Sequence, residues 1–558
     1  MKRNELKLIV ILLVLSGGLR FAGITFDSLW LDEGYQTLAD ATGQELPNFV
    51  QPANHPFLFH FDRPHCLQAV LNNFRHVDPL CPPLYPLVLN RWMAVFGDSD
   101  LTIRLLSMVF SLSSLVVLFV LVKNLFGFQT AIFVSIVQAV SPFDILYAQE
   151  ARMYSLTVLA SAVSCGAFIW LIKQRSSTGR SLCGLLVYVG STWALINSHY
   201  TALFILVFQG LFGTWYCLRQ RLLRLYTCLV CSWVCIFLLW LPWFDLFRQA
   251  AALRTASFYV VRSQSWWWPL WALAVRIPFN WVVFLTGKKV MLYAVPLYVT
   301  AALMLVLAAV FALPDKILNQ FTRWCSLQPS KVNKPLLADG CDKITKQDLS
   351  FFMWSWAIVP AVAVWLLDVV EGHKVIEISR YLIATAPAIY VLVGLGLSRL
   401  YTNAQTTVCP NGAENMQRQG ALHSNPFVVS FVPWFLMSHV TFALINNAYA
   451  HLIPQREPWR EMASKIESLC HRDDLIVVSQ YYDIVCLDRY LKIPMRQLGV
   501  SPSMGATDID RLLANHRRFW LVTAQEGDKV KALIPARFKA LRHLDLGHSL
   551  HLLLYEAL

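Results

Sequence analysis

Two acidic strings each follow an apolar run of the chain. Asp32 and Glu33 come after the first hydrophobic segment, and Glu150 comes after the third. A carboxylate at a membrane surface is costly unless it performs chemistry or holds a cation. If the segments cross a membrane in alternating directions, both strings face the same side. The sequence therefore predicts acids gathered at one membrane–water boundary and an enzyme that acts on a lipid-borne substrate.

These residue types allow structural as well as chemical roles. Asp32 would suit a helix N-cap, and Glu33 the first turn of the same helix. Glu150 and Arg152 could form a local ion pair, worth at most about 1 kcal/mol at an exposed site. As chemistry, the two acidic loops could bind a divalent cation such as Mg²⁺ or Mn²⁺ through oxygens. They could also divide the duties of general base and of orienting a substrate.

Further polar residues are expected on the same face. His199 and Tyr200 begin the sixth apolar run, where a lone His is more often a cap or a packing residue than a catalyst. Lys374 and Arg380 lie at the start of the tenth run. An Arg at that depth could hold a lipid phosphate through two hydrogen bonds. The alternative is an anchoring role, in which the side chain extends its charge to the interface.

Composition places most of the chain in lipid. The 558 residues are 56% hydrophobic and 15% charged, with a mean hydropathy of +0.49, whereas soluble domains carry about 25% charged residues. The net charge of +13 does not call for nucleic acid, because the Lys and Arg cluster in short loops between apolar runs. That distribution is typical of cytoplasmic loops of membrane proteins. Membrane lipids are expected partners, and nucleic acid is not.

Apolar runs long enough to cross a hydrocarbon core of about 30 Å recur along the chain. They predict a polytopic α-helical membrane protein with about 11–13 spans. The first run follows Lys2 and Arg3 without a small-residue cleavage site, so it is expected to remain as an anchor. With the N-terminus inside, the basic loops all fall on the cytoplasmic side. The runs lie at 8–26, 101–122, 129–147, 153–172, 182–198, 200–218, 227–244, 290–312, 350–369, 381–399 and 426–446.

Residues 245–289 do not follow this pattern, because they place basic residues on the expected outside. One interpretation is an interfacial helix with an aromatic belt at 266–268. The other is one more span, which would reverse the orientation of everything downstream. Exported Arg residues would also suit a protein that grips lipid phosphates. The polar stretch at 315–349 is expected to be a flexible cytoplasmic linker.

Two parts of the chain are expected to be exported. Within the membrane domain at 1–450, a first external loop spans 27–100, and its residues 82–97 predict a short helix that lies on the membrane and begins at a proline. Residues 455–558 alternate a helix-like segment at 459–469 with strand-like segments at 475–479, 519–523 and 551–555, and predict a small soluble α/β domain.

The cysteines form neither a CxxC pair nor a Cys/His set with zinc spacing. If the exported face is oxidising, Cys66 could pair with Cys81, and Cys470 with Cys486. Cys within the apolar runs is more often a small apolar residue.

The order of the motifs resembles that of polytopic glycosyltransferases with the GT-C fold. The closest groups are the protein-mannosyltransferase-like and aminoarabinose-transferase-like families of bacteria. The string at 457–461 is similar to one that opens the extracytoplasmic domain in many relatives, with Pro458 where Asp is common. Cys81 stands where the family often has a His, a role that His76 or His65 could take. The other motifs lie at 28–36, 82–85, 96–98, 104–105, 149–154, 199–200 and 380–382.

The resemblance implies an inverting transfer of a sugar from a polyprenyl-phosphate-linked donor to a lipid, glycan or protein acceptor. It places the enzyme in the plasma membrane (the inner membrane of bacteria), with its catalytic face extracytoplasmic. Asp32 would act as the base or orient the acceptor hydroxyl, with Glu33 as the acid beside it. Glu150 would contact the acceptor or a metal ion. The candidates for gripping the donor phosphate are Arg380, Arg152 and Lys374, and the accessory candidates are Tyr154, His199, Tyr200 and His76.

Two alternative functions would each leave a different pattern in the sequence. A transporter or lipid flippase would place ionisable residues near the midplane, often in repeated halves with broken helices, whereas here the acids lie at the ends of spans and no repeat is found. A lipid-linked polysaccharide polymerase or ligase would rely on Arg-rich external loops more than on acids that follow a helix. The basic residues within 245–289 keep this second alternative open.

Overall fold

The computed structural model is mostly helical and ends in a small sheet domain. All structural statements below concern the residues that it describes. These are 3–43, 67–76, 81–173, 178–256, 265–287, 295–311, 344–406, 426–450, 452, 456–471, 474–480, 483–493, 495–500, 504–524 and 527–558.

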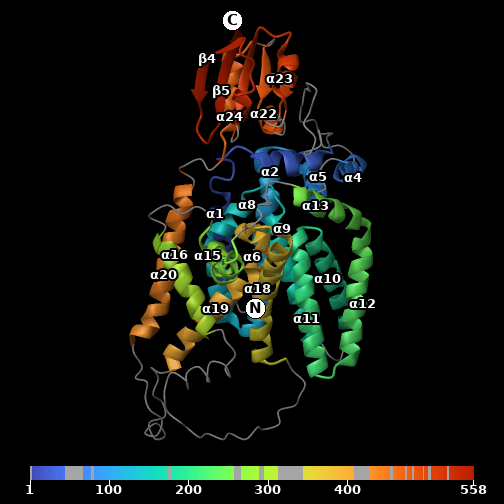
Figure 1. The fold of residues 1–558 in the computed structure, drawn as a ribbon. Helices are drawn as coiled ribbons and strands as arrows, with labels where there is room; N and C mark the ends of the chain where they lie inside the picture. The colour runs from blue at the N-terminus through green and yellow to red at the C-terminus, as the bar shows by residue number, and fades with distance from the viewer. Residues whose placement is uncertain are drawn as a thin grey trace, which may run out of the picture.

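Long apolar helices form a bundle, and each predicted apolar run overlaps one of them, except that 129–147 overlaps two (Figure 1). Within the described ranges, seven helical stretches are long and apolar enough to cross a membrane, or eight if the bent pair α7 and α8 is one span. The predicted polytopic fold is confirmed. The bundle helices are α1 (Arg3–Phe21), α6 (Asp100–Phe126), α7 (Phe128–Val140), α8 (Pro142–Ala148), α9 (Tyr154–Lys173), α10 (Thr178–Ile196), α11 (Leu203–Arg219), α12 (Leu223–Trp240), α16 (Val295–Phe311), α18 (Lys346–Glu371), α19 (Ala386–Thr406) and α20 (Pro426–Ala450).

Some predicted boundaries are wrong for local reasons. The first run ends at Phe21 and continues as turns rather than as helix. The stretch 315–349, expected to be a linker, lies largely outside the described residues, but its end is helical because Thr345 and Asp348 form a capping box that starts α18.

The run 129–147 is not one straight helix but two, α7 and α8, bent by 60°. Pro142 stands in the first turn of α8, and the hydroxyl of Ser141 accepts a hydrogen bond from the Asp144 backbone N–H. A break in a buried helix leaves carbonyl groups without partners. Arg20 donates to the Gln138 and Ala139 carbonyls at 3.3 and 3.0 Å and pairs with Asp144 at 2.6 Å. This network holds α8, which ends just before the second acidic loop.

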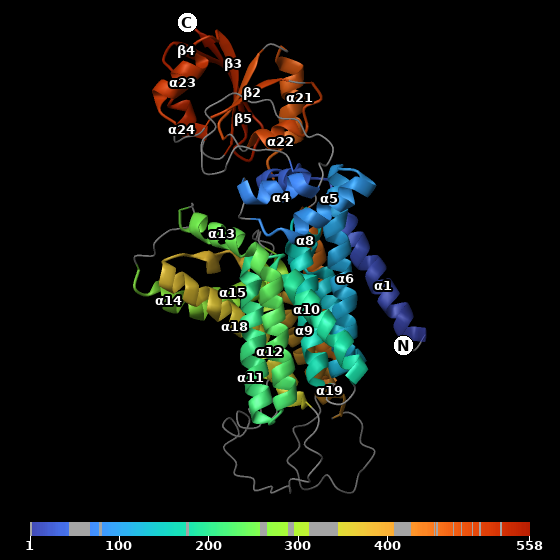
Figure 2. The same ribbon diagram turned by 90° about the vertical axis from the view of Figure 1, so that its right-hand side faces the viewer.

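The ambiguous segment 245–289 forms several short helices. They are α13 (Phe244–Ala256), α14 (Trp268–Trp271), the π-helical turn η4 (Ala272–Arg276) and α15 (Ile277–Thr286). The stretch Trp268–Thr286 is apolar and long enough for a span, yet in both views α14 and α15 lie across the long helices and not along them (Figures 1 and 2). This direction favours the interpretation in which the segment does not reverse the downstream topology.

The first loop forms a layer of short helices at one end of the bundle (Figure 1). The helix predicted at 82–97 is confirmed as α5, where Pro83 precedes its first residue. Asp32 and Glu33 lie in the short helix that opens this layer. The layer contains α2 (Leu31–Glu33), the π-helical turn η1 (Gly34–Ala39), α3 (Asp40–Thr42), α4 (Leu67–His76) and α5 (Leu84–Phe96).

The C-terminal α/β domain is also present, on the far side of this layer (Figure 2). Its sheet has the order β2-β1-β3-β5-β4, with β1, β2 and β3 parallel and β5 antiparallel to both of its neighbours. The predicted helix and three predicted strands are confirmed, while β2 and β4 were not expected. The elements are α21 (Trp459–Leu469), β1 (Leu475–Val478), α22 (Ile484–Asp488), β2 (Arg496–Gly499), α23 (Ala506–Leu513), β3 (Arg518–Thr523), α24 (Gly527–Lys531), β4 (Phe538–Asp545) and β5 (His551–Ala557).

The domain docks directly on the first loop through α22. A Cβ added to Gly34 would lie 3.0 Å from the Cys486 sulfur, so the glycine permits this close approach. Cys470 and Cys486 are both free thiols, which does not bear out a disulfide between them. Cys66 lies outside the described residues, so its predicted disulfide with the buried Cys81 stays a prediction.

Candidate active site

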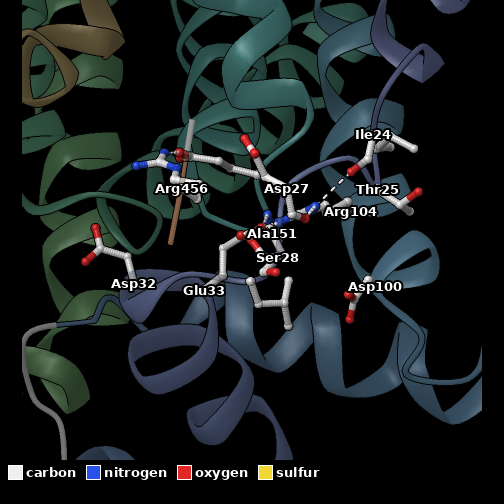
Figure 3. Close-up of polar contacts among 12 residues, drawn as sticks. Ile24, Thr25, Asp27, Ser28, Asp32, Glu33, Asp100, Arg104, Ala151 and Arg456 are labelled. Carbon is white, nitrogen blue, oxygen red and sulfur yellow. Dashed lines mark hydrogen bonds and ion pairs between the residues drawn. The ribbon is translucent and has the colours of Figure 1, made fainter. Parts of the chain in front are cut away.

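The two adjacent acids of the first loop have different environments. Both oxygens of Glu33 are held by Arg104, at 2.9 and 2.6 Å, and one of them also accepts the Ala151 backbone N–H at 2.7 Å (Figure 3). Arg104 donates in addition to carbonyl groups of residues 24, 27 and 28. Glu33 is therefore a fully paired buried acid that ties the first loop to α6 and to the second acidic loop.

Asp32 points away from Glu33, as Figure 3 shows. Its Oδ2 lies 3.2 Å from Nη1 of Arg380 and 3.9 Å from Nη2 of Arg152. Arg152 also donates to the Asp32 backbone carbonyl at 3.0 Å and to the Thr37 hydroxyl at 3.0 Å. The carboxylate thus faces two guanidinium groups from distant parts of the chain, Arg152 in the loop between α8 and α9 and Arg380 in the 3-10 turn before α19.

Glu150 is buried in the loop between α8 and α9 and pairs with Arg456 through Oε1. Burial raises the pKa of this carboxyl, and the positive charge of Arg456 opposes the shift. The guanidinium of Arg456 lies 3.8 Å from the centre of the Trp30 ring, and that of Arg380 lies 5.8 Å from the same ring. Trp30 therefore lies beside both the arginine that pairs with Glu150 and the arginine that pairs with Asp32.

Further aromatic side chains lie close to Arg380. The Tyr154 ring lies 5.9 Å from its guanidinium and 5.7 Å from that of Arg152. His199 packs against Tyr154 and Tyr381, with ring centres 6.1 and 5.7 Å away. Its side chain also accepts the Thr201 backbone N–H and so caps a short helical turn. His199 therefore caps a helical turn and also packs against the aromatic rings that lie beside Arg380.

Three other candidates lie elsewhere or outside the described residues. Lys374 lies 5.9 Å from the Trp268 ring, and its contacts shown by the structure do not include Asp32 or Glu150. Tyr200 packs edge-to-face against Phe247. The side chain of His76 is not among the described ones.

Several buried polar atoms of this cluster make no hydrogen bond within the described part of the chain. Asp32 Oδ2 is one of them, although it forms the ion pair with Arg380. Most buried polar groups in proteins are hydrogen-bonded, so a concentration of exceptions indicates a place where a ligand completes the bonding. The atoms are Trp30 Nε1, Asp32 Oδ2, Glu150 Oε2, Arg152 Nε and Arg380 Nε.

A divalent cation does not fit the described donors well. No group of three or more His, Cys, Asp or Glu that could hold a metal ion occurs among the described residues. Asp32 and Glu150 each face guanidinium groups instead of further oxygens. A cluster with more cations than anions suits a negatively charged ligand better.

Sequence reasoning missed two residues of this site. Arg104 appeared only as part of a motif, and its pairing with Glu33 follows from the helix packing. Arg456 directly precedes the string at 457–461, but nothing in that string shows that it contacts Glu150. The only available signal was its position between the last membrane helix and the soluble domain.

Comparisons with known proteins bear on the fold that carries this site. Residues 81–243 match the family model described as dolichyl-phosphate-mannose-protein mannosyltransferase. Structures of ArnT from Cupriavidus metallidurans, in the apo state and bound to undecaprenyl phosphate, align at 13% identity over 98% of both chains with TM-scores of 0.53 and 0.55. The chain has the GT-C fold.

A second similar structure comes from another kind of enzyme. The oligosaccharyltransferase of Archaeoglobus fulgidus, in complex with Zn and sulfate, aligns at 10% identity over 94% of this chain and 69% of its own, with a TM-score of 0.53. No curated protein has a significantly similar sequence. The family match and the fold together indicate a membrane glycosyltransferase, which favours an enzyme over the transporter alternative.

Proposed function

We propose that this protein transfers a sugar from a polyprenyl-phosphate-linked donor to the hydroxyl of an acceptor at the extracytoplasmic face of the plasma membrane. The observation that carries the proposal is the cluster of Asp32, Glu150, Arg152 and Arg380, with its buried polar atoms left without hydrogen bonds. Two of the similar structures hold undecaprenyl phosphate and dolichol phosphate, respectively. Both ligands are polyprenyl phosphates, which supports a lipid-linked donor.

The proposed reaction is a single displacement that inverts the anomeric carbon. The acceptor oxygen bonds to C1 of the sugar while the bond from C1 to the phosphate oxygen breaks, and its electron pair leaves with the lipid phosphate. Asp32 Oδ2 accepts the hydroxyl proton, because it is a buried carboxylate oxygen without a hydrogen bond. Arg380 and Arg152 stabilise the negative charge that develops on the departing phosphate. Glu150 orients the acceptor.

Other residues position this machinery in the proposal. Glu33 holds the backbone of the second acidic loop through Ala151, so it fixes the distance between the two acidic strings. Tyr154 and His199 pack around Arg380 and restrict its orientation. Lys374 remains a candidate for longer-range attraction of the lipid phosphate.

A donor screen tests the proposed function. The purified protein in liposomes is incubated with sugars linked to polyprenyl phosphate and, separately, with the same sugars linked to nucleotides. With an acceptor present, transfer of the sugar and release of polyprenyl phosphate are expected from the lipid-linked sugars, and no transfer is expected from the nucleotide-linked ones. Turnover with nucleotide sugars alone would contradict the proposal. Adding EDTA, Mg²⁺ or Mn²⁺ to the same assay, with the wild type and Glu150→Gln, distinguishes an acceptor contact from a metal ligand.

The proposed orientation has its own test. In sealed vesicles of known orientation, a protease added outside should digest the C-terminal domain only where the extracytoplasmic face is outward. Digestion only in inverted vesicles would reverse the assignment.

A further inference from the structure

Arg456 enters the candidate site from outside the bundle. It follows α20, the last bundle helix, and precedes α21, the first helix of the C-terminal domain. Its guanidinium pairs with Glu150 and lies 3.8 Å from the centre of the Trp30 ring. One side chain from the segment between the bundle and the C-terminal domain thus contacts both acidic loops. It meets Trp30 in the first and Glu150 in the second.

Glu150 depends on this contact for its charge balance. Besides Arg456, the charged groups that act on it are Arg380, which favours its ionised form, and Glu33 and Asp32, which oppose it. Glu150 Oε1 is bound by Arg456, whereas Oε2 is buried without a hydrogen bond in the described residues. Arg456 therefore fixes one oxygen of the carboxylate and leaves the other available.

The segment that carries Arg456 is itself held in place by a clamp around Asp100, at the start of α6. Arg460 and the Tyr490 hydroxyl donate to Asp100 Oδ2 at 2.8 and 2.7 Å, and Arg489 lies 3.4 Å from Oδ1. Arg460 also donates to the Thr25 carbonyl at 2.7 Å. These contacts join the C-terminal domain to the turns just before Trp30. We define them as the Asp100 clamp.

We propose that Arg456 is a positioning residue that orients the Glu150 carboxylate toward the acceptor, and that the Asp100 clamp holds Arg456 in that position. The C-terminal domain is then part of the active site and not only a domain packed on it. A substrate-orienting carboxylate that turns away by about 1 Å can lower the rate about 100-fold. This role rests on the proposed function, because it uses Glu150 as the acceptor contact.

A double-mutant cycle tests the proposal in the full-length protein. The variants are Arg456→Gln, Glu150→Gln, the double variant and Arg456→Lys, assayed for kcat and for KM of donor and acceptor. The matched control is Arg537→Gln, which removes an Arg whose exposed ion pair with Asp510 lies within the C-terminal domain. The expected result is a loss of about 100-fold in Arg456→Gln, partial recovery in Arg456→Lys, and a double variant no worse than Glu150→Gln.

The outcomes separate this role from the nearest alternatives. Multiplicative losses in the double variant would overturn it, because Arg456 would then act independently of Glu150. A rise confined to the donor KM would also overturn it, in favour of a donor-phosphate contact. Asp100→Asn is expected to copy the kinetic defect of Arg456→Gln, and normal kinetics in that variant would remove the clamp from the proposal.

A second measurement does not depend on the donor. The melting temperatures of the same variants in detergent report the Arg456–Glu150 pair directly. If the wild type transfers no sugar from polyprenyl phosphates, the proposed function fails, while non-additive melting shifts would still show that the pair is formed. Additive shifts would show that it is not.

Discussion

Two buried clusters of charge lie at the two ends of α8, and they differ in how completely they are hydrogen-bonded. In the first, Arg20 donates to Ser111, to carbonyl groups at the break between α7 and α8, and to Asp144 at 2.6 Å. In the second, around Asp32 and Glu150, both acids and two of the arginines keep a polar atom without a hydrogen bond in the described residues. Both clusters pay the desolvation penalty of buried charge.

The difference indicates which cluster serves structure and which serves a ligand. A saturated network stabilises one conformation and offers no atom to a substrate. An unsaturated one retains donors and acceptors that a substrate can satisfy. The same contrast separates the neighbours Glu33 and Asp32, since Glu33 is fully bonded to Arg104 and Ala151.

The strongest test of this contrast is Asp32→Asn. The amide cannot accept the hydroxyl proton, so turnover should fall about 100- to 10,000-fold, while the affinity for the donor is retained. Single-turnover assays with a lipid-linked sugar, together with a donor-binding measurement, check this. Turnover close to that of the wild type would remove Asp32 as the base.

Arg380→Gln is expected to have the next largest effect. It removes a positive charge at the position proposed for the departing phosphate, so kcat should fall about 100- to 1,000-fold, with weaker donor binding. Titration of the purified protein with polyprenyl phosphate measures the binding part. Unchanged affinity and rate would place the phosphate elsewhere in the site.

A substitution in the fully hydrogen-bonded cluster around Arg20 should change the stability of the protein more than its activity. Arg20→Gln leaves Asp144 buried without its cation, so the free energy of unfolding should fall by about 3–5 kcal/mol, with little change in turnover per folded molecule. Thermal melting in detergent with an activity assay on the folded fraction checks this. A variant that melts normally but loses turnover would show that the contrast between the clusters is wrong.

The smallest expected effect is a change in pH dependence. Burial raises the pKa of Glu150, so this carboxyl takes up a proton at a higher pH than an ordinary Glu does. Activity that needs its ionised form should then decline as the pH falls through that raised pKa, earlier than for an exposed acid. Glu150→Gln should lose this acidic limb of the profile, and an unchanged limb in the variant would assign it to another group.

Much of the fold could be predicted because apolar length and periodicity report membrane helices locally. The helix at 82–97 and the helix at Trp459–Leu469 followed from the same local patterns. The break at Ser141 and the crosswise direction of α15 could not be predicted. Both depend on what neighbouring helices offer, namely the Arg20 guanidinium at the break and the packing surface under α15.

The sequence by itself determined that acids and arginines gather at one face of a membrane protein, because helix parity and charge placement are properties of the chain. The tertiary structure alone decided how these residues share their bonds. Glu33 and Asp32 are adjacent in the chain, yet their side chains point in different directions and meet partners from different helices. Arg456 reaches Glu150 only because the C-terminal domain docks on the first loop. Hydrogen bonding depends on distance and direction between segments far apart in sequence, and no local pattern encodes that geometry.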